Sequence, residues 1–500
     1  MRDLMPDLRS MLSVGIDVGT TTTQLVFSRL FLSDSARPGQ IPRIGITDKT
    51  VIYQSPVVFT PLADHETIDV PRLMEIVRRE YRQAGMDPQE IETGAVIITG
   101  ETAKKNNADE ILQALGGMAG EFVVTVAGPN LESMIAGRGS GAAQYSQKYF
   151  CKVTNIDIGG GSANSSTFQS GKMIAAAAMN YGGRILEIDH ASGRIRHIAE
   201  PARAILNDLR LDLKPGDSPS LSDLRLFTGR MADLTVELLE GGASPLAQKI
   251  YLTPPARISA AGTVLMLSGG IGHYYYHPLP IASVSDVTLH DDVGPLLAES
   301  LRLHPAIAAY EVVPPAETIR ATVLGASSQT VSLSGSTIWA DKDILPLRNV
   351  PVVRPLLDIA DAGNSGALST AFAEAIQRWD LNPKGSDGRF QNVAALPFAI
   401  AFDFNRQLDY NTLNQLAEAL AHLSENTLPP GFPLIVIITR DYAQALGQTI
   451  KAICAASTPD RPLLVIDQVG LEEGDYIDIG APIMDGRVVP VSVKTLIFYH

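Results

Sequence analysis

The amino-acid sequence predicts an α/β protein with two similar lobes followed by an additional α/β domain. Two apolar strands, near residues 14–18 and 153–158, each end in an aspartate and a glycine-bearing turn, and the texture of the chain changes beyond about residue 330. The length of 500 residues exceeds that of one ordinary domain and favours about three units. We expect a first lobe, a second lobe and a C-terminal domain over residues 1–150, 151–330 and 331–500.

Composition excludes several classes of protein. Hydrophobic residues make up 45% of the chain and charged residues 19%, which suits sizeable cores and argues against global disorder. The formal charge of −14 without a basic cluster predicts no nucleic-acid partner. No apolar run of about 18 residues predicts a membrane span, and Met1 to Leu12 lacks the apolar region of a secretory signal. Cys151 and Cys454 are expected to be buried, inert thiols in a reducing cytoplasm.

The predicted first lobe begins with a β-hairpin. The apolar stretch from Met11 to Val18 leads through Gly19 and a run of threonines into a second alternating stretch, Thr23 to Phe27. Helical spacing predicts a helix over Val70 to Ala84. A strand over 94–99, a short helix over 108–115 and a strand over 122–127 are expected next. A helix that starts at Pro129 and runs through Met134 follows them.

The predicted second lobe repeats the opening hairpin. A strand over 153–158 meets Gly159 to Ser162 and continues as a strand over 164–168. Residues 200–250 are expected to be mostly helical, with a break at 214–220, before a buried strand from Thr263 to Leu267 and a third glycine turn at 268–272. In the C-terminal domain we expect a strand, a helix and a strand at 433–438, 442–455 and 462–467, closed by a hairpin around 485–486.

The paired hairpins carry the chemistry. A triphosphate requires backbone N–H groups at close range, and glycines leave room for that approach. A carboxylate at the end of a strand can hold a hydrated magnesium ion that neutralises the phosphates. One such hairpin alone is typical of an ordinary β-turn, whereas two matched ones predict a clamp for Mg²⁺ and ATP or ADP. The chain has no P-loop motif.

The expected magnesium ligands are Asp17 and Asp157. Besides these two aspartates, the residues expected to contact the phosphates are their neighbours Gly19, Thr20, Thr21, Thr22, Gly159, Gly160 and Gly161. The third glycine motif, Ser268, Gly269 and Gly270, is expected to lie against the adenosine. The threonine run also fits plain strand propensity, but its place beside Asp17 and Gly19 favours phosphate contact.

The order of these motifs resembles the superfamily of actin, sugar kinases and heat-shock chaperones. The two hairpins resemble its phosphate motifs, Ser268 to Gly270 its adenosine motif, and Pro129 to Gly141 and Ala321 to Ser327 its connecting helices. The resemblance implies two ribonuclease H-like lobes that close on ATP.

A narrower resemblance is to the reactivating factors of ethanolamine ammonia-lyase, the EutA family. Ile98 to Lys104, Asn155 to Asn164 and the additional C-terminal domain carry it. It implies a chaperone-like protein with weak ATPase activity that releases damaged cobalamin from the lyase so that adenosylcobalamin can enter. It also implies residence in the cytoplasm with a bacterial microcompartment.

One departure concerns hydrolysis. Chaperone ATPases of this fold carry Glu-Pro at the start of the first connecting helix, where this chain has Gly128–Pro129. Glu132 and Glu101 are the candidates to place the attacking water, and slow hydrolysis or a purely conformational use of nucleotide is consistent with the change.

Two other function classes stay open from sequence. A small-molecule kinase would need a general base, which the sequence does not reveal, and a nucleotide-controlled scaffold or filament is compatible with the same motifs. His273 and His277 could share a metal if helical, although a packed aromatic segment is favoured, and Arg194 to His197 fits the exposed face of a strand. Truncation near Pro346 is expected to preserve ATP binding and abolish reactivation.

Overall fold

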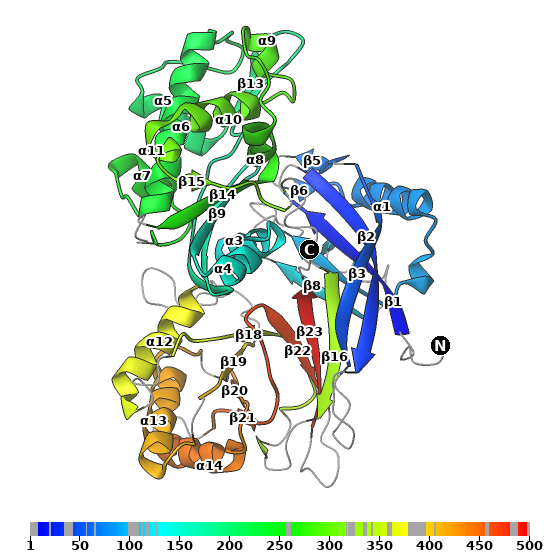
Figure 1. Cartoon of the computed structure of the whole chain (residues 1–500), viewed down its shortest axis with the longest axis vertical. Helices are drawn as coiled ribbons and strands as arrows, with labels where there is room; N and C mark the ends of the chain where they lie inside the picture. The colour runs from blue at the N-terminus through cyan, green and yellow to red at the C-terminus, as the bar shows by residue number, and fades with distance from the viewer. Residues whose placement is uncertain are drawn as a thin grey trace. The chain divides into compact units, whose positions relative to one another are not determined.

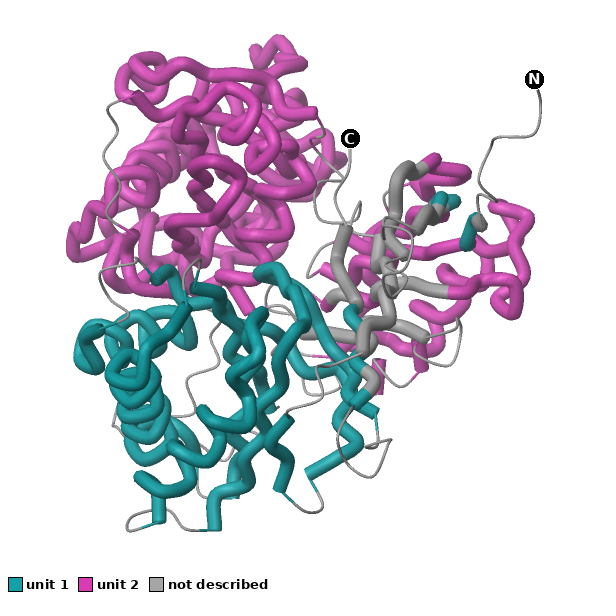
Figure 2. The backbone as a smooth tube through the Cα atoms, turned by 60° about the horizontal axis from the view of Figure 1, so that its bottom comes forward, with its two compact units in different colours: residues 1–11, 29–49, 327–496 teal, residues 12–28, 50–326, 497–500 magenta. Residues whose placement is uncertain are grey.

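The computed structural model describes residues 9–497 apart from a set of segments. These are residues 20–21, 35–43, 57, 65–66, 99–109, 112–113, 116–120, 127, 257–261, 317, 319–325, 334–337, 342–343, 358–362, 379–396, 405–406, 430, 456–459 and 481–488. The chain divides into two compact units, drawn in different colours in Figure 2. One comprises residues 12–28, 50–326 and 497–500, and the other comprises residues 1–11, 29–49 and 327–496.

The first sheet has the strand order β3-β2-β1-β7-β8, with β4 paired to β2. β1 (Arg9–Val18) runs parallel to β7 (Thr93–Ile98), which runs parallel to β8 (Glu121–Val126). The other strands are β2 (Thr22–Asp34), β3 (Ile44–Gln54) and β4 (Val58–Phe59). The predicted helix α1 (Val70–Ala84) buries Leu73, Val77 and Tyr81 in one cluster with Val14 and Ile16 of β1.

The second sheet repeats this order as β11-β10-β9-β14-β15, of which Figure 1 labels β9, β14 and β15. β10 (Ala163–Gln169) is antiparallel to β9 (Lys152–Ile158) and β11 (Lys172–Met179). β14 (Thr263–Ser268) runs parallel to β9 and to β15 (Glu311–Val312). In each sheet the first strand is central, its two successors lie on one side and two later parallel strands on the other. This repeated topology confirms the predicted two-lobed, actin-like α/β fold.

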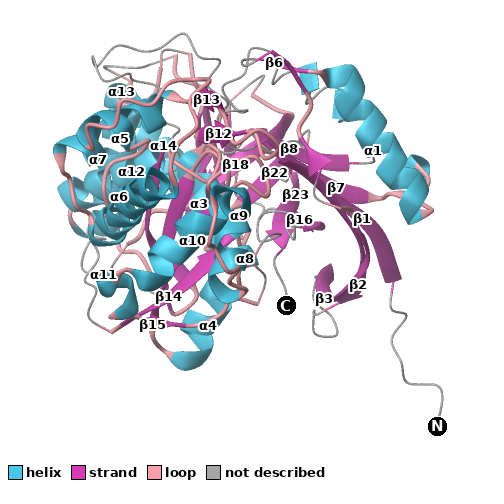
Figure 3. Cartoon of the chain, turned by 90° about the horizontal axis from the view of Figure 1, so that it is seen from above, coloured by secondary structure: helices cyan, strands magenta, loops and turns pink. Residues whose placement is uncertain are grey.

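Helices cover the second sheet where the sequence predicts them. α3 (Pro129–Gly139) starts at its proline and packs against β9, β10 and β11. α5 (Glu200–Asp208), α6 (Leu221–Glu240) and α7 (Pro245–Ile250) bury their apolar faces in one core around the predicted break. Reciprocal hydrogen bonds between Ser220 and Asp223 cap α6. α8 (Gly269–Tyr276) lies against β14 and α10 (Gly294–Leu303), as Figure 3 shows.

A short two-stranded sheet carries the predicted alternating segment. β12 (Leu186–Ile188) pairs with β13 (Ile195–Ile198), which buries Ile195 and Ile198 and turns Arg196 outward. Arg196 forms ion pairs with Asp189 and Asp291. The expected exposed face of a strand is confirmed.

The unit that comprises residues 1–11, 29–49 and 327–496 is called the C-terminal unit here. It contains an eight-stranded sheet of order β16-β23-β22-β18-β19-β20-β21-β17. β18 to β21 run parallel, and α12, α13 and α14 connect them in turn. The predicted strand–helix–strand appears as β20, α14 and β21, and β22 and β23 form the terminal antiparallel pair, whose expected turn lies outside the described residues. The bounds are β16 (Ala326–Leu333), β17 (Trp339–Ala340), β18 (Leu347–Val353), α12 (Ser365–Arg378), β19 (Ala399–Phe402), α13 (Tyr410–Asn426), β20 (Leu434–Ile438), α14 (Ala443–Cys454), β21 (Leu463–Ile466), β22 (Asp475–Ile479) and β23 (Pro490–Ile497).

The strand order of this sheet shows that a truncation near Pro346 would cut through the sheet. β16 and β17 precede Pro346, yet they lie next to β23 and β21 in the sheet. A cut near Pro346 would therefore leave two strands without partners, with unpaired edges that favour aggregation. Removing this sheet as a whole requires a cut before Ala326.

Three smaller expectations can be compared with the described residues. Cys454 is buried as expected, whereas Cys151 is only half-buried, and burial raises the pKa of the Cys151 thiol. Within the described part of the chain, no helix has both the length and the apolar character that crossing a bilayer demands. The rings of His273 and His277 stack with their centroids 4.7 Å apart, and the described residues contain no cluster of three or more His, Cys, Asp or Glu side chains suited to a metal.

Candidate nucleotide site

The first predicted hairpin closes in a tight turn. Asp17, 8% exposed, is the penultimate residue of β1. The Gly19 N–H donates to the Thr22 carbonyl over 2.9 Å, which joins β1 to β2. The Thr60 hydroxyl donates to the Gly19 carbonyl over 2.8 Å and lies 3.0 Å from the Thr23 hydroxyl. Thr20 and Thr21, at the tip of the turn, lie outside the described residues.

The second hairpin has the same turn at the same offset. Asp157 is the penultimate residue of β9 and is also 8% exposed. The Gly159 N–H donates to the Ser162 carbonyl over 3.1 Å, as Gly19 does to Thr22. Each aspartate therefore stands two residues before the glycine that opens a four-residue turn.

A separate segment packs against the second turn and orients its peptide groups. The Gly183 N–H donates to the Gly159 carbonyl over 3.0 Å, and the Arg184 N–H to the Gly160 carbonyl over 2.8 Å. Within the described residues, the N–H groups of Gly160 and Gly161 donate to no other backbone carbonyl. Unsatisfied N–H groups in a half-buried turn attract an anion such as a phosphate.

Asp157 sits in a prepared electrostatic environment. It is opposite Ser268 on the neighbouring parallel strand β14, and the Ser268 hydroxyl donates to the Asp157 carboxylate over 2.6 Å. The Asn155 amide donates to the same hydroxyl over 2.9 Å. Burial raises the pKa of Asp157 to about 6, and the bond from Ser268 opposes that shift. At neutral pH the group is thus an ionised carboxylate with little water, which a bound cation would stabilise.

The third glycine motif is a helix start and not the expected turn. β14 ends at Ser268 and α8 begins at Gly269. Gly269 has a φ of +76°, and a Cβ there would lie 2.4 Å from the Ile158 carbonyl oxygen, so only glycine fits against β9. A Cβ at Gly270 would meet nothing within 4 Å. The fold thus brings the third motif against the Asp157 hairpin and leaves Gly270 open.

One side chain links the two hairpins. The Arg184 guanidinium lies over the Phe59 ring, 4.5 Å from its centroid, while Phe59 pairs with Thr22 between β4 and β2. The predicted sequence motifs did not include Phe59, Thr60 or the segment from Gly182 to Arg184. The adjacent glycines at 182 and 183 were the one local signal, and nothing local marks Phe59 or Thr60.

Of the two glutamates expected to place the attacking water, only one is among the described residues. Glu132 is buried in the first turn of α3, while Glu101 lies outside the described residues. Their roles in hydrolysis stay predictions, as do the nucleotide and magnesium contacts.

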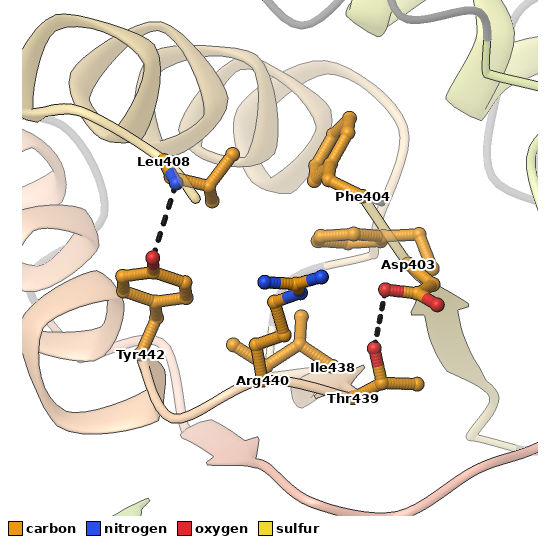
Figure 4. Close-up of a pocket in the computed structure, with 8 residues that line it drawn as sticks. Asp403, Phe404, Leu408, Ile438, Thr439, Arg440 and Tyr442 are labelled. Carbon is orange, nitrogen blue, oxygen red and sulfur yellow. Dashed lines mark hydrogen bonds between the residues drawn. The ribbon is translucent and has the colours of Figure 1, made fainter. Parts of the chain in front are cut away.

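The C-terminal unit has a pocket of its own at the carboxyl ends of β19 and β20 (Figure 4). The Thr439 hydroxyl donates to Asp403 over 2.5 Å, and the Leu408 N–H to the Tyr442 hydroxyl over 3.1 Å. The edge formed by the carboxyl ends of parallel strands is where ligands of open α/β sheets bind. Its lining is Phe402, Asp403, Phe404, Leu408, Ile438, Thr439, Arg440 and Tyr442.

Comparison with known proteins places the chain in a family. The model of the family described as ethanolamine utilisation protein EutA matches residues 9–499. A relative named ethanolamine ammonia-lyase reactivase EutA, from Salmonella typhimurium, is 40% identical over 490 residues, which cover 98% of this chain and 99% of the relative. The Escherichia coli protein of the same name is 41% identical over 493 residues, with the same coverage. Among solved structures, an Aquifex aeolicus member of the Ppx/GppA family aligns with 63% of this chain and 97% of its own, at 15% identity and a TM-score of 0.36. The family model and the two full-length relatives establish that this chain belongs to the EutA family.

Proposed function

We propose that this chain is an ATP-dependent reactivase of ethanolamine ammonia-lyase. It would act as a chaperone that releases damaged cobalamin from the inactivated lyase so that adenosylcobalamin can bind. The observation that carries this proposal is the similarity to two proteins named as reactivases of that lyase, which spans 98% of this chain. The place of action would be the cytoplasm, in association with a bacterial microcompartment.

The paired hairpins support ATP as the ligand. The N–H groups of Gly160 and Gly161 would bind phosphate oxygens, and Gly270 leaves room for the adenosine. Asp17 and Asp157 would hold a magnesium ion, which neutralises phosphate charge when bound. Hydrolysis itself needs a group that places water, for which Glu132 and Glu101 are the candidates.

Nucleotide would drive the cycle through its differential contacts. A ligand shifts a conformational equilibrium only by the difference in its affinity for the two states. Phosphates held by both hairpins favour an arrangement in which the hairpins approach each other, and loss of the terminal phosphate weakens that preference. Such a switch can work on a bound lyase even when turnover is slow.

The direct test is recovery of lyase activity. Lyase inactivated by damaged cobalamin is incubated with this protein, adenosylcobalamin, ATP and Mg²⁺, and ethanolamine deamination is followed. We expect recovery only when protein, ATP and Mg²⁺ are all present. A parallel ATP-turnover assay with a panel of polyols tests the kinase alternative, since phosphorylation of a polyol without lyase recovery would contradict the proposal.

A further inference from the structure

The backbone of Arg184 is fixed to the second phosphate hairpin. Its N–H donates to the Gly160 carbonyl, and a Cβ at the preceding Gly182 would lie 2.5 Å from the Gly159 carbonyl oxygen. Contact this close leaves the segment no freedom to shift along the turn. The root of the Arg184 side chain is therefore set by the turn itself.

The side chain of Arg184 reaches from that hairpin to the other one. Its guanidinium lies over the ring of Phe59, which pairs with Thr22 at the start of β2. The adjacent Thr60 donates to the Gly19 carbonyl of the first turn. The Arg184 side chain thus extends from the second hairpin to a residue that pairs with the first.

One nitrogen of this guanidinium lacks a partner. Nη1 is buried and makes no hydrogen bond in the described structure. Nε lies 3.7 Å from the Glu187 carboxylate, a loose ion pair, and the side chain as a whole is 21% exposed. A buried, charged donor without an acceptor is rare, because its desolvation is not compensated. Its planar fork matches the oxygens of a phosphate.

The neighbouring acids leave this nitrogen without a hydrogen bond. Asp292 is half-buried and precedes Val293, whose N–H donates to the Gly183 carbonyl, and the Asp292 carboxylate accepts from the Gly294 N–H over 2.8 Å. Burial raises the pKa of Asp292 to about 6; the bond from Gly294 and the positive charge of Arg184 oppose that shift, and the charges of Asp291 and Glu187 add to it. Because Glu187 engages Nε, Nη1 remains for a ligand.

We propose that Arg184 binds the terminal phosphate of the bound nucleoside triphosphate and so makes the site prefer ATP to ADP. The inference rests on the proposed nucleotide function and adds a residue that neither hairpin motif contains. Because Arg184 contacts the second hairpin and, through Phe59, the first, binding of the terminal phosphate to its guanidinium would affect both of them.

The test compares ATP with ADP in arginine variants. Binding of Mg-ATP and Mg-ADP is measured by calorimetry for the full chain, for Arg184→Met and for Arg184→Gln, which keeps hydrogen-bonding capacity without charge. We expect the affinity for ATP to fall at least tenfold in both variants and that for ADP to change less than threefold. Arg225→Met is the matched control, because Arg225 is an exposed arginine whose guanidinium is already paired with Glu299.

The outcomes separate the two proposals. Equal losses for ATP and ADP, or no loss for either, would show that Arg184 only packs over Phe59 and would overturn the inference. If the unmodified protein binds neither nucleotide, the proposed nucleotide function fails first. Melting of each variant without nucleotide verifies folding, and Arg184→Gln decides the question if Arg184→Met does not fold.

Discussion

The two phosphate hairpins have one geometry and two different supports. In each, an aspartate 8% exposed precedes the turn glycine by two residues, and that glycine donates to the carbonyl three residues on. The first turn is held by hydroxyl groups, since Thr60 bonds the Gly19 carbonyl and contacts Thr23. The second is held by backbone, since Gly183 and Arg184 donate to its carbonyls.

Because the two turns are supported differently, substitutions should affect the first hairpin and the second hairpin to different extents. A support made of hydroxyl groups can lose one hydrogen bond at a time, at a cost of about 1 kcal/mol each. A support made of close backbone contacts has no room for even one added carbon, so a small substitution displaces the whole turn. We therefore expect larger effects from changes around Asp157 than from comparable changes around Asp17.

The largest effect is expected from a methyl group at Gly269. Gly269→Ala places a Cβ 2.4 Å from the Ile158 carbonyl oxygen in a left-handed conformation, which should lower the free energy of unfolding by about 2–4 kcal/mol. The neighbour Gly270 is the control, because a Cβ there has open space and alanine favours the helix. Chemical denaturation of both variants decides, and equal stability of Gly269→Ala and the unmodified chain would refute the packing argument.

The second prediction concerns the charge of Asp157. Its pKa is about 6 when folded, above the ordinary value of 3.8, so the folded chain binds a proton more tightly than the unfolded one. Stability is therefore lost as the pH rises from about 4 to about 6, by up to about 3 kcal/mol. Asp157→Asn removes that loss, so without nucleotide or magnesium it should be the more stable protein at pH 7.

The pH dependence is the readout for this prediction. The stability advantage of Asp157→Asn over the unmodified chain should shrink as the pH falls and vanish near pH 4. Urea denaturation at several pH values measures it. An advantage that is constant with pH, or a less stable variant at pH 7, would show that the buried charge is not the cause.

The smallest effect is expected at the first hairpin. Thr60→Val keeps the shape of the side chain but removes the donor to the Gly19 carbonyl, which should cost about 1 kcal/mol of stability. Thr60→Ser keeps the hydroxyl and serves as the control. A melting temperature of Thr60→Val equal to that of the unmodified chain would mean that the hydroxyl does not support the turn.

Much of the fold could be predicted because local signals set it. Both hairpins, α1, α3 and the strand–helix–strand of the C-terminal unit follow from periodicity, glycine and proline. The start of α8 was misjudged because glycines signal a turn locally, while packing of Gly269 against Ile158 decides its conformation. No local sequence pattern predicts the role of Arg184, because its partners Gly160 and Phe59 are brought together only by the fold.

Whether Asp17 and Asp157 bind the same nucleotide is tested most directly by calorimetry. Calorimetric titration with Mg-ATP compares the unmodified chain with Asp17→Ala and Asp157→Ala, and with Asp212→Ala, an exposed carboxylate paired to Lys214, as the control. We predict at least tenfold weaker binding in both hairpin variants, unchanged binding in the control, and melting temperatures at or above that of the unmodified chain for Asp157→Ala. Binding lost in only one hairpin variant, or in neither while the protein stays folded, would contradict the paired clamp.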